Sequence, residues 1–391
     1  MTEIERDTIV VGLGAWGSAA LWRLAARGID VAGIERYGIG HPLGSTHGTT
    51  RLFRIACQEH PGLPPIALTS LRLWRELGEE TGEVYVRQTG FLGVGSPTST
   101  PVAGAIAAAR SAGVPLERLS HEELAARFPT YGGLAGDEVA VIDPQAGICY
   151  PERFVRGHVA AARRLGADVY PHTMVTAIEP GTDRIRLRTP TVDFLARRIV
   201  LALGAWLVKY VPELPLQPRR TPMYWFRPRQ DATGAYDLAH FPGFIRALPD
   251  GTLLWGHGSA EGFDIKIGPG DEAGFFRDTD ADEVDRYVHQ DTDIAPLSRL
   301  VERAFPGLDP QPAKVIPCMV TNSPDGQFLV GPLISDPRIV VAGGDSGHGA
   351  KHAAGLGELI ARLVVGEEPY TPIGFLDPNR FATAPAGLPS R

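Results

Sequence analysis

The chain has 391 residues, with 38 basic and 45 acidic side chains, which gives a formal net charge of −7 at pH 7. At about 150 residues per domain, this length predicts two to three domains with a sizeable core. The acidic balance argues against a general nucleic-acid binder and against docking to an anionic membrane. A hydrophobic fraction of 43% and a charged fraction of 21% are ordinary for a soluble globular protein and exclude wholesale disorder, a collagen or a coiled coil.

The three cysteines, Cys57, Cys149 and Cys318, form no C-x-x-C pair. They support neither a disulfide framework nor a structural zinc site, so we predict no metal and a reducing, cytoplasmic environment. The uncharged stretch at residues 8–22 is broken by three glycines and is too short to span a bilayer. Acidic residues precede it, whereas an export signal would open with a basic segment, so we expect neither export nor membrane association.

Residues 7–34 form the pattern of a strand, a glycine-rich turn, a helix and a second strand. The turn carries G-x-G-x-x-G, with Gly12, Gly14 and Gly17, and Glu35 follows the second strand. The first two glycines permit a tight turn that approaches a pyrophosphate closely, and the third lets the helix pack on the strand. Glu35 stands at the spacing of an acid that binds a ribose hydroxyl. This combination predicts a dinucleotide site; the alternative is a structural α/β turn without a ligand.

The remaining sequence alternates between helical and strand-like segments, while residues 216–318 are richer in proline, aromatic residues and strand-like runs. We therefore predict an α/β fold with two domains, in which a Rossmann-like dinucleotide domain carries an inserted mixed-sheet (α+β) domain. Helices are expected at about residues 64–80, 102–112, 121–128, 152–165 and 353–365. The dinucleotide domain is expected at residues 1–85, 146–215 and 320–391, and the inserted domain at residues 86–145 and 216–319.

Several segments share motifs with one family of flavoenzymes. Residues 44–54, GSTHGTTRLFR, resemble the G-S-x-H-G-x-T-R-x-x-R segment of the monomeric sarcosine oxidase and N-methyltryptophan oxidase family. Further matches follow in the same order along the chain: Gly204-Ala205-Trp206, Cys318-Met319 with Thr321, and Ser346-Gly347-His348-Gly349 with Lys351. With the glycine turn, these matches extend from residue 7 to residue 351 and cover most of the sequence.

The resemblance implies an FAD-dependent oxidase that acts on the C–N bond of an N-substituted or cyclic amino acid. The product would be an imine, later hydrolysed or rearranged, and O₂ would be reduced to H₂O₂. The expected partners are therefore a small amino-acid-like substrate and O₂, with no nucleic acid and no membrane, and the protein is expected to be a monomer. The FAD-binding domain would correspond to the Rossmann-like domain, and the inserted domain would bind the substrate.

The resemblance also implies a flavin bonded through its 8α-methyl group to Cys318. A buried cysteine that serves only packing is the alternative. The thiolate is the reactive form, so positive charge from Arg51 should favour the bond. Residues expected to contact FAD, from the glycine motif and from the resemblance, are Gly12, Gly14, Gly17, Glu35, Arg36, Ser45, Thr46, Thr50, Gly204, Trp206, Cys318, Gly344, Gly347, His348, Gly349 and Lys351.

Arg54 and Lys351 match the family's pair that holds the substrate carboxylate. An arginine suits a bidentate grip on a planar carboxylate, and a lysine adds a second point charge. Lys266 matches the family's lysine near flavin N5, where a preorganised cation would stabilise the superoxide formed from O₂. The alternative for Lys266 is a lysine on a strand face that reaches solvent. However, the chain has only four lysines, and two of them fall on positions important in the family.

Three further side chains lie in the matching motifs. His47 and Arg51 resemble residues beside the flavin ring, where they would assist catalysis; either could instead be a structural side chain. His348 is expected to orient its loop rather than to transfer protons.

The sequence also departs from the family pattern. Val320 stands where sarcosine oxidases typically carry tyrosine, Pro269-Gly270 where they carry histidine, and Thr46 where many members carry a second histidine. These changes remove polar groups from the pocket wall, so we do not assign sarcosine as the substrate. Candidates to line a larger or more aromatic pocket are Tyr224, Trp225, Trp255 and His257, although strand aromatics are more often core residues.

Other functions fit part of the pattern. A fructosyl amino acid oxidase or a biosynthetic imino-acid oxidase would share the same fold and chemistry. A nicotinamide-dependent dehydrogenase would use the glycine motif but would leave Cys318 and Lys266 without a role. A flavin-binding protein with a purely structural role would not need Arg54 and Lys351.

Overall fold

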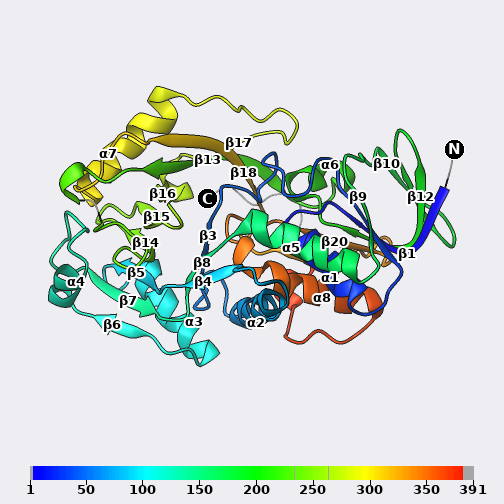
Figure 1. Ribbon diagram of the computed structural model, residues 1–391, viewed down its shortest axis with the longest axis horizontal. Coiled ribbons are helices and arrows are strands. Elements are labelled where there is room, and N and C mark those ends of the chain that lie inside the picture. Colours follow the sequence, from blue (N-terminus) through cyan, green and yellow to red (C-terminus); the bar gives the residue numbers. More distant parts are fainter. Residues whose placement is uncertain (1–2, 233, 263, 382–391) are drawn as a thin grey trace.

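The computed structural model describes residues 3–232, 234–262 and 264–381. Figure 1 shows two large sheets at opposite ends of the long axis, with a small third sheet between them. The end that contains β1 is covered by long helices, and the other end is made mainly of antiparallel strands. Within these residues, no helix is both long and apolar enough to cross a membrane.

The first sheet has eight strands, and its middle is parallel. β1 pairs with β12 on one side and β2 on the other, β9 extends beyond β2, and β20 lies beside the end of β12. The carboxyl ends of these five strands therefore lie along one edge. The strands are β1 (Glu3–Val11), β2 (Val31–Ile34), β9 (Asp168–Tyr170), β10 (Ala177–Pro180), β11 (Ile185–Arg188), β12 (Asp193–Leu201), β19 (Leu329–Pro332) and β20 (Ile339–Gly343).

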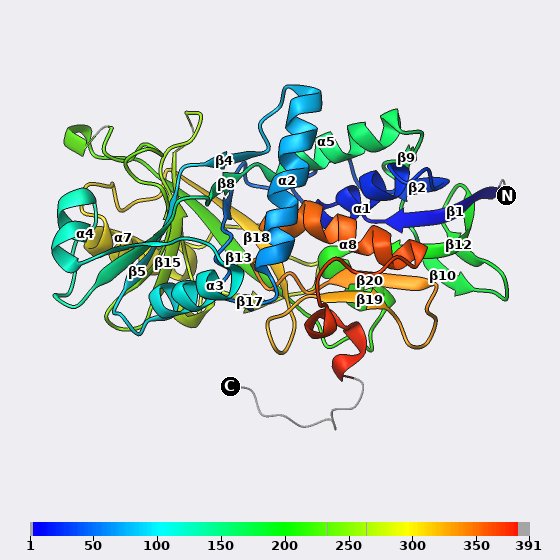
Figure 2. The ribbon, with the colours of Figure 1, turned by 90° about the horizontal axis from the view of Figure 1, so that it is seen from below.

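Helices cover this sheet because a parallel sheet must bury both faces. Figure 2 shows α1 beside α5 and α8. The contact between α1 and α8 is close: a Cβ atom on Gly357 would lie 2.4 Å from the Cβ of Ala19, so only glycine fits there. The helices of this half are α1 (Ala15–Ala25), α2 (Pro64–Thr81), α5 (Pro151–Arg164), α6 (Leu207–Tyr210) and α8 (Ala353–Val365).

The second sheet has nine strands and is mixed, since β5 and β14 are parallel while the other pairs are antiparallel. An aromatic cluster that includes Tyr131, Phe241, Phe244 and Phe305 fills the core of this half of the protein. Helices α4 (His121–Arg127) and α7 (Ala295–Ala304) contribute side chains to this cluster, whereas α3 (Ala105–Ala112) packs in a smaller one with Val102 and Val141. The strands of this second sheet are β5 (Phe91–Gly95), β6 (Glu117–Leu119), β7 (Val139–Asp143), β13 (Gln217–Phe226), β14 (Gly243–Ala247), β15 (Leu253–His257), β16 (Ile265–Pro269), β17 (Arg277–Asp278) and β18 (Lys314–Asn322).

The predicted fold class, an α/β protein with an additional mixed sheet, is confirmed. The strands of the two large sheets come from the two sets of segments expected for the two domains, except that β18 extends to Asn322. β4 (Val86–Gln88) lies in a segment expected for the inserted domain but is not part of the second sheet. It joins β3 (Arg51–Phe53) and β8 (Gly147–Cys149) in the small third sheet. The division into two domains stays a prediction, and residues 1–2, 233, 263 and 382–391 of its ranges lie outside the described part.

Candidate active site

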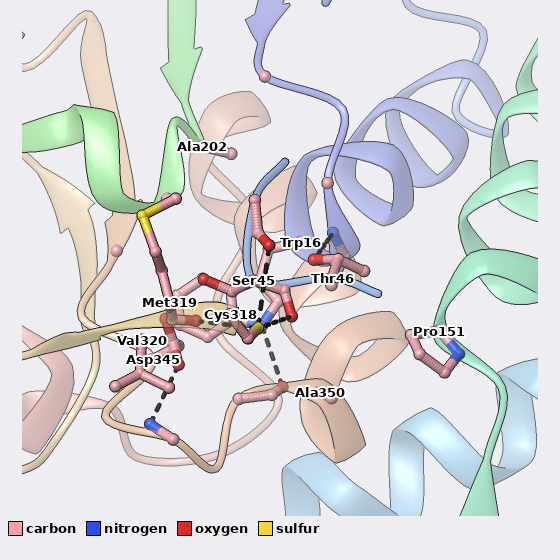
Figure 3. Close-up of a pocket in the computed structure, with 18 of the residues that line it drawn as sticks. Trp16, Ser45, Thr46, Pro151, Ala202, Cys318, Met319, Val320, Asp345 and Ala350 are labelled. Atoms are coloured by element: carbon pink, nitrogen blue, oxygen red, sulfur yellow. Dashed lines mark hydrogen bonds between the residues drawn. The ribbon is translucent and has the colours of Figure 1, made fainter. Parts of the chain in front are cut away.

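A cavity of about 450 Å³ extends from the carboxyl ends of the parallel strands to the second sheet. Its near end is lined by residues that directly follow β1, β2, β12 and β20, and its far end by residues of β13, β14 and β15. Figure 3 shows part of the lining, with Trp16 of α1, Ala202 after β12 and Cys318 of β18 around one space. Ligands of open α/β sheets bind at this edge.

The glycine turn has the geometry that the sequence predicts. Gly12 has a φ of +88°, and a Cβ atom there would lie 2.5 Å from the carbonyl oxygen of Ala202. A Cβ atom on Gly17 would lie 1.9 Å from the carbonyl oxygen of Gly12, so the third glycine lets helix α1 pack on the turn. Gly14 meets nothing closer than 3.4 Å and lines the cavity with the start of α1. The amino end of a helix favours an anionic group such as a phosphate.

Glu35 lies at the end of β2 and borders the same end of the cavity. Its carboxylate accepts hydrogen bonds from the backbone amides of Leu13, at 2.8 Å, and Tyr37, at 2.9 Å, and His41 Nε2 lies 3.3 Å away. Burial raises the pKa of Glu35, but these hydrogen bonds outweigh burial and hold the pKa below its ordinary value. Glu35 is therefore an ionised acceptor beside the glycine turn.

All the residues expected to contact FAD line the cavity except Gly17 and Thr50. Gly17 lies beneath the turn, and the Thr50 hydroxyl is hydrogen-bonded at 2.8 Å to buried His257. The cavity fits a dinucleotide with a polar ring system for two reasons. Its glycines leave backbone exposed to a ligand, and the Ser45 hydroxyl is buried without a hydrogen-bond partner among the described residues.

Cys318 lines the cavity and faces Ser45, whose carbonyl oxygen lies 3.8 Å from the sulfur (Figure 3). Arg51 Nη2 lies 3.9 Å from the same sulfur. Burial raises the pKa of the Cys318 thiol, and Arg51 acts in the opposite direction without reversing the shift. The expected effect of Arg51 is therefore present but smaller than the effect of burial. Cys57 and Cys149 are fully buried and do not line the cavity.

Arg54 and Lys351 lie together in the cavity lining, and an unpredicted carboxylate lies between them. Glu59 Oε1 forms an ion pair with Arg54 Nη2 and lies 3.3 Å from Lys351 Nζ, which also donates a hydrogen bond of 2.9 Å to the carbonyl of His348. Burial raises the pKa of Glu59, but the two cations hold it well below its ordinary value. The second oxygen of Glu59 and the Nε of Arg54 have no hydrogen-bond partner among the described residues.

Lys266 is fully buried but does not line the cavity. Its amine donates hydrogen bonds of 2.9 Å to the carbonyl oxygens of Gly48 and Thr50. The amine thus lies behind the wall segment that leads to Arg51, which does line the cavity. Burial lowers the pKa of Lys266 well below its ordinary value, and the charge of Arg51 lowers it further.

The predicted histidines His47 and His348 differ in their position relative to the cavity. His47 is buried outside the cavity lining, and burial, with Arg51 next in importance, lowers its pKa to about 3. His348 borders the cavity, and its Nε2 lies 2.9 Å from the carbonyl of Gly326. Burial lowers the pKa of His348 to about 4, so both imidazoles are neutral at pH 7. The contact with Gly326 holds the glycine-rich loop that contains His348.

The far end contains the carboxylate of Asp271, which is ion-paired with Arg219, but its wall is mainly apolar. Trp255 lines it, and its indole N–H donates a 2.9 Å hydrogen bond to the carbonyl of Pro269. Tyr224 does not line the cavity: it is fully buried in the aromatic core on the other face of β13, because neighbouring strand residues point to opposite faces. Trp225 and His257 are also outside the lining. The wall residues are Leu52, Ile245, Leu253, Trp255, Pro269, Gly270, Phe276 and Val320, which include positions where the family pattern is not kept.

Sequence reasoning also missed Asp345, which borders the cavity on the loop after β20 (Figure 3). Its carboxylate accepts hydrogen bonds from the backbone amides of Thr321, at 3.2 Å, and Gly347, at 3.0 Å. Burial raises the pKa of Asp345 to about 6. Its neighbour Ser346 has a φ of +43°, a conformation that few non-glycine residues adopt. A signal for Asp345 was present, since it directly precedes the matched segment Ser346-Gly347-His348-Gly349.

Comparison with known proteins identifies the class. Residues 7–363 match the FAD-dependent oxidoreductase family, and the chain belongs to that family. Monomeric sarcosine oxidase of Streptomyces avermitilis is 35% identical over 386 residues, which are 97% of this chain and 99% of the relative. N-methyl-L-tryptophan oxidase of Yersinia pestis is 30% identical over 361 residues, 92% and 94% of the two chains. The protein is thus a flavoenzyme related to these oxidases, which confirms the resemblance and removes the nicotinamide alternative.

Solved structures agree in fold. NikD, described as an unusual amino acid oxidase essential for nikkomycin biosynthesis, matches with a TM-score of 0.81 at 23% identity, covering 96% of this chain and 98% of NikD. The fructosyl amine: oxygen oxidoreductase of Aspergillus fumigatus matches with a TM-score of 0.76 at 17% identity, covering 97% and 91%. At these identities the likeness concerns the fold alone.

Proposed function

We propose that this protein oxidises the C–N bond of an N-substituted or cyclic amino acid, with O₂ as the electron acceptor and H₂O₂ as a product. One observation carries the proposal: the buried pair Arg54 and Lys351 lines the same cavity as the glycine turn and Glu35 of a dinucleotide site. FAD, when bound, supplies the redox chemistry by accepting a hydride equivalent and passing its electrons to O₂.

The residues of the chain bind and orient the substrate. Arg54 and Lys351 carry two positive charges against the single negative charge of Glu59, so this part of the cavity favours an anionic group. Binding of the substrate carboxylate there fixes the orientation of the rest of the amino acid in the cavity. Such positioning can supply a large part of the rate acceleration when no covalent intermediate with the protein is formed. The apolar wall around Trp255 excludes water and favours a neutral amine, the form that can lose a hydride equivalent.

The size of the substrate follows from the same wall. The relatives are named for sarcosine, whose side chain is a hydrogen atom, and for N-methyl-L-tryptophan, which is much larger. Here Leu253, Trp255 and Phe276 line the far end. We infer that the preferred substrate carries an apolar group larger than that of sarcosine. A screen of N-methyl amino acids, cyclic amino acids and fructosyl amino acids for H₂O₂ release tests this, and sarcosine as the best substrate would contradict it.

We further propose that FAD is bonded to Cys318. Cys318 lines the cavity, and Arg51, 3.9 Å from its sulfur, supplies positive charge for the thiolate. The test is the visible spectrum of the purified protein, followed by acid precipitation of wild type, Cys318→Ser and the matched control Cys149→Ser. Yellow colour in the pellet of wild type and control, but in the supernatant of Cys318→Ser, is expected. Colour released from wild type would disprove the bond but leave the oxidase proposal intact.

A further inference from the structure

Lys266 is a buried cation of an unusual kind. Among the described residues, no ion pair includes its amine, although the amine is completely removed from solvent. Two of its three N–H groups are directed to the carbonyl oxygens of Gly48 and Thr50. A buried ammonium without further compensation would lose its proton, because burial disfavours the charged form. The third contact of the amine therefore decides its state.

That third contact is the face of Trp225. The Nζ atom of Lys266 lies 4.9 Å from the centroid of the indole ring, within the range of a cation–π interaction. Strand register fixes the contact, since Trp225 of β13 is paired with Lys266 of β16 on one side and with Lys314 of β18 on the other. Lys314 Nζ lies 5.0 Å from the same ring but is exposed. Trp225 itself is only 3% exposed, so it also separates Lys266 from solvent.

We propose that Trp225 is a positioning residue that keeps the Lys266 amine charged, with its ring face completing the coordination begun by the carbonyls of Gly48 and Thr50. The contact between Trp225 and Lys266 stands by itself. Its consequence for catalysis rests on the proposed function, in which Lys266 assists the reduction of O₂. A ring face is a suitable partner because it stabilises a cation without adding a negative charge, so the positive field remains available to a nearby anion.

Other charged and titratable groups near Lys266 do not remove the need for this contact. The positive charge of Arg51 opposes protonation of Lys266, whereas Glu152 and the thiols of Cys318 and Cys149 favour it more weakly than burial opposes it. His47 and His257 are both close enough to be influenced by the Lys266 charge, and both have a pKa of about 3, so neither contributes charge at pH 7.

The composition of the chain makes a direct test practical. Only four lysines are present, Lys209, Lys266, Lys314 and Lys351, so a holoenzyme labelled with ¹³Cε-lysine gives at most four lysine signals in an NMR spectrum. Loss of one signal in Lys266→Met assigns the residue. Titration then gives the midpoint for Lys266 in wild type, Trp225→Phe and Trp225→Leu. Lys314→Met is the matched control, since it removes the exposed cation that also lies over the same ring.

We expect the midpoint of Lys266 to fall by about one pH unit in Trp225→Leu and by less in Trp225→Phe, because indole is a better cation partner than benzene. Lys314→Met should leave the midpoint in place. The rate of reoxidation by O₂, measured by stopped flow across the same pH range, should begin to fall at a pH that is lower by the same amount. The rate of flavin reduction by substrate should be unchanged. Should Trp225→Leu fail to fold, Trp225→Phe still provides the comparison.

Two outcomes are distinguishable. An unchanged Lys266 midpoint in a folded, flavin-loaded Trp225 variant would overturn the inference, as would a Lys266 that is neutral throughout the titration of wild type. If the midpoint moves but the O₂ reaction does not, Trp225 does control the charge, and the expected role of Lys266 in O₂ reduction is the part that fails.

Discussion

The two buried lysines of this site are stabilised in opposite ways. Lys351 shares a carboxylate, Glu59, with Arg54, whereas Lys266 contacts carbonyl oxygens and the Trp225 ring and forms no ion pair within the described part of the chain. A carboxylate partner neutralises the charge locally and can yield to the carboxylate of a ligand. Carbonyl groups and an aromatic ring stabilise the cation but leave its net charge in place. The difference suits a binding site in the first case and an electrostatic role in the second.

The strongest test of this comparison is removal of the Lys266 charge. Lys266→Met keeps the length and apolar body of the side chain, so packing is preserved. We expect reoxidation by O₂ to slow by about 10²–10³-fold, the effect of losing one preorganised electrostatic partner. Reduction of the flavin by substrate should survive. Stopped-flow measurement of the two half-reactions checks this, and an equal loss in both would contradict the separate role of Lys266.

Removal of the shared carboxylate tests the other lysine. Glu59→Gln leaves Arg54 and Lys351 buried without their counter-ion, and the free energy of unfolding should fall by about 3 kcal/mol. Because the folded-state pKa of Glu59 is lowered, its contribution is present above the ordinary pKa of 4.5 and is lost as the pH falls below that value. Urea denaturation at pH 7 and at lower pH measures both effects.

Glu79→Gln, a change on the exposed face of α2, is the matched control for Glu59→Gln and should have little effect. Added acetate should restore much of the stability lost in Glu59→Gln, since a free carboxylate can occupy the vacated anion position. If acetate stabilises the variant no more than it stabilises wild type, the pair Arg54 and Lys351 does not bind carboxylates in the way proposed.

A milder change examines the geometry of the binding pair. Arg54→Lys preserves the positive charge but removes the planar fork that can bind a carboxylate through two parallel hydrogen bonds. We expect kcat/KM for the amine substrate to fall by about 10–100-fold, the value of one charge-assisted hydrogen bond. Arg72→Lys, at an exposed position of α2, is the control. Unchanged kinetics in Arg54→Lys would show that only the charge matters.

The dinucleotide end of the cavity could be predicted from sequence because local backbone rules determine it. The close approach at Gly17 and the positive φ of Gly12 depend on residues within one short segment. The expected helix at about residues 64–80 similarly corresponds to α2, Pro64–Thr81, since its apolar spacing and its proline start are local features.

The substrate end could not be predicted in the same way because strand register and loop packing assemble it. The contact between Trp225 and Lys266 depends on the pairing of β13 with β16. The sequence Tyr224-Trp225-Phe226 has an aromatic residue at every position, so it gave no indication of which face points to the cavity, and Tyr224 was assigned to the wrong side. Glu59 belongs to no motif, and its position between two cations is visible only in three dimensions.

Asp345 sharpens the comparison because, among the residues that the structure describes, its hydrogen-bond partners are neutral, as are those of Lys266. Backbone amides of Thr321 and Gly347 are its hydrogen-bond donors, and burial raises its pKa from 3.8 to about 6. A raised pKa means that the folded protein prefers the protonated form, so wild type loses stability as the pH rises from about 4 to about 6. Asp345→Asn cannot ionise and escapes this loss, although its amide replaces one of the two acceptor oxygens.

The melting temperature of Asp345→Asn relative to wild type should therefore improve between pH 4 and pH 7, by about 2 °C because the side chain is partly accessible through the cavity. Asp231→Asn, at an exposed position, should show no such trend. The direction of the trend is the informative quantity, since the lost acceptor lowers the stability of the variant equally at every pH. If the difference in melting temperature between the variant and wild type stays constant from pH 4 to pH 7, the two backbone amides stabilise the carboxylate of Asp345 as well as water does. A buried charge in this cavity would then need no ionic partner.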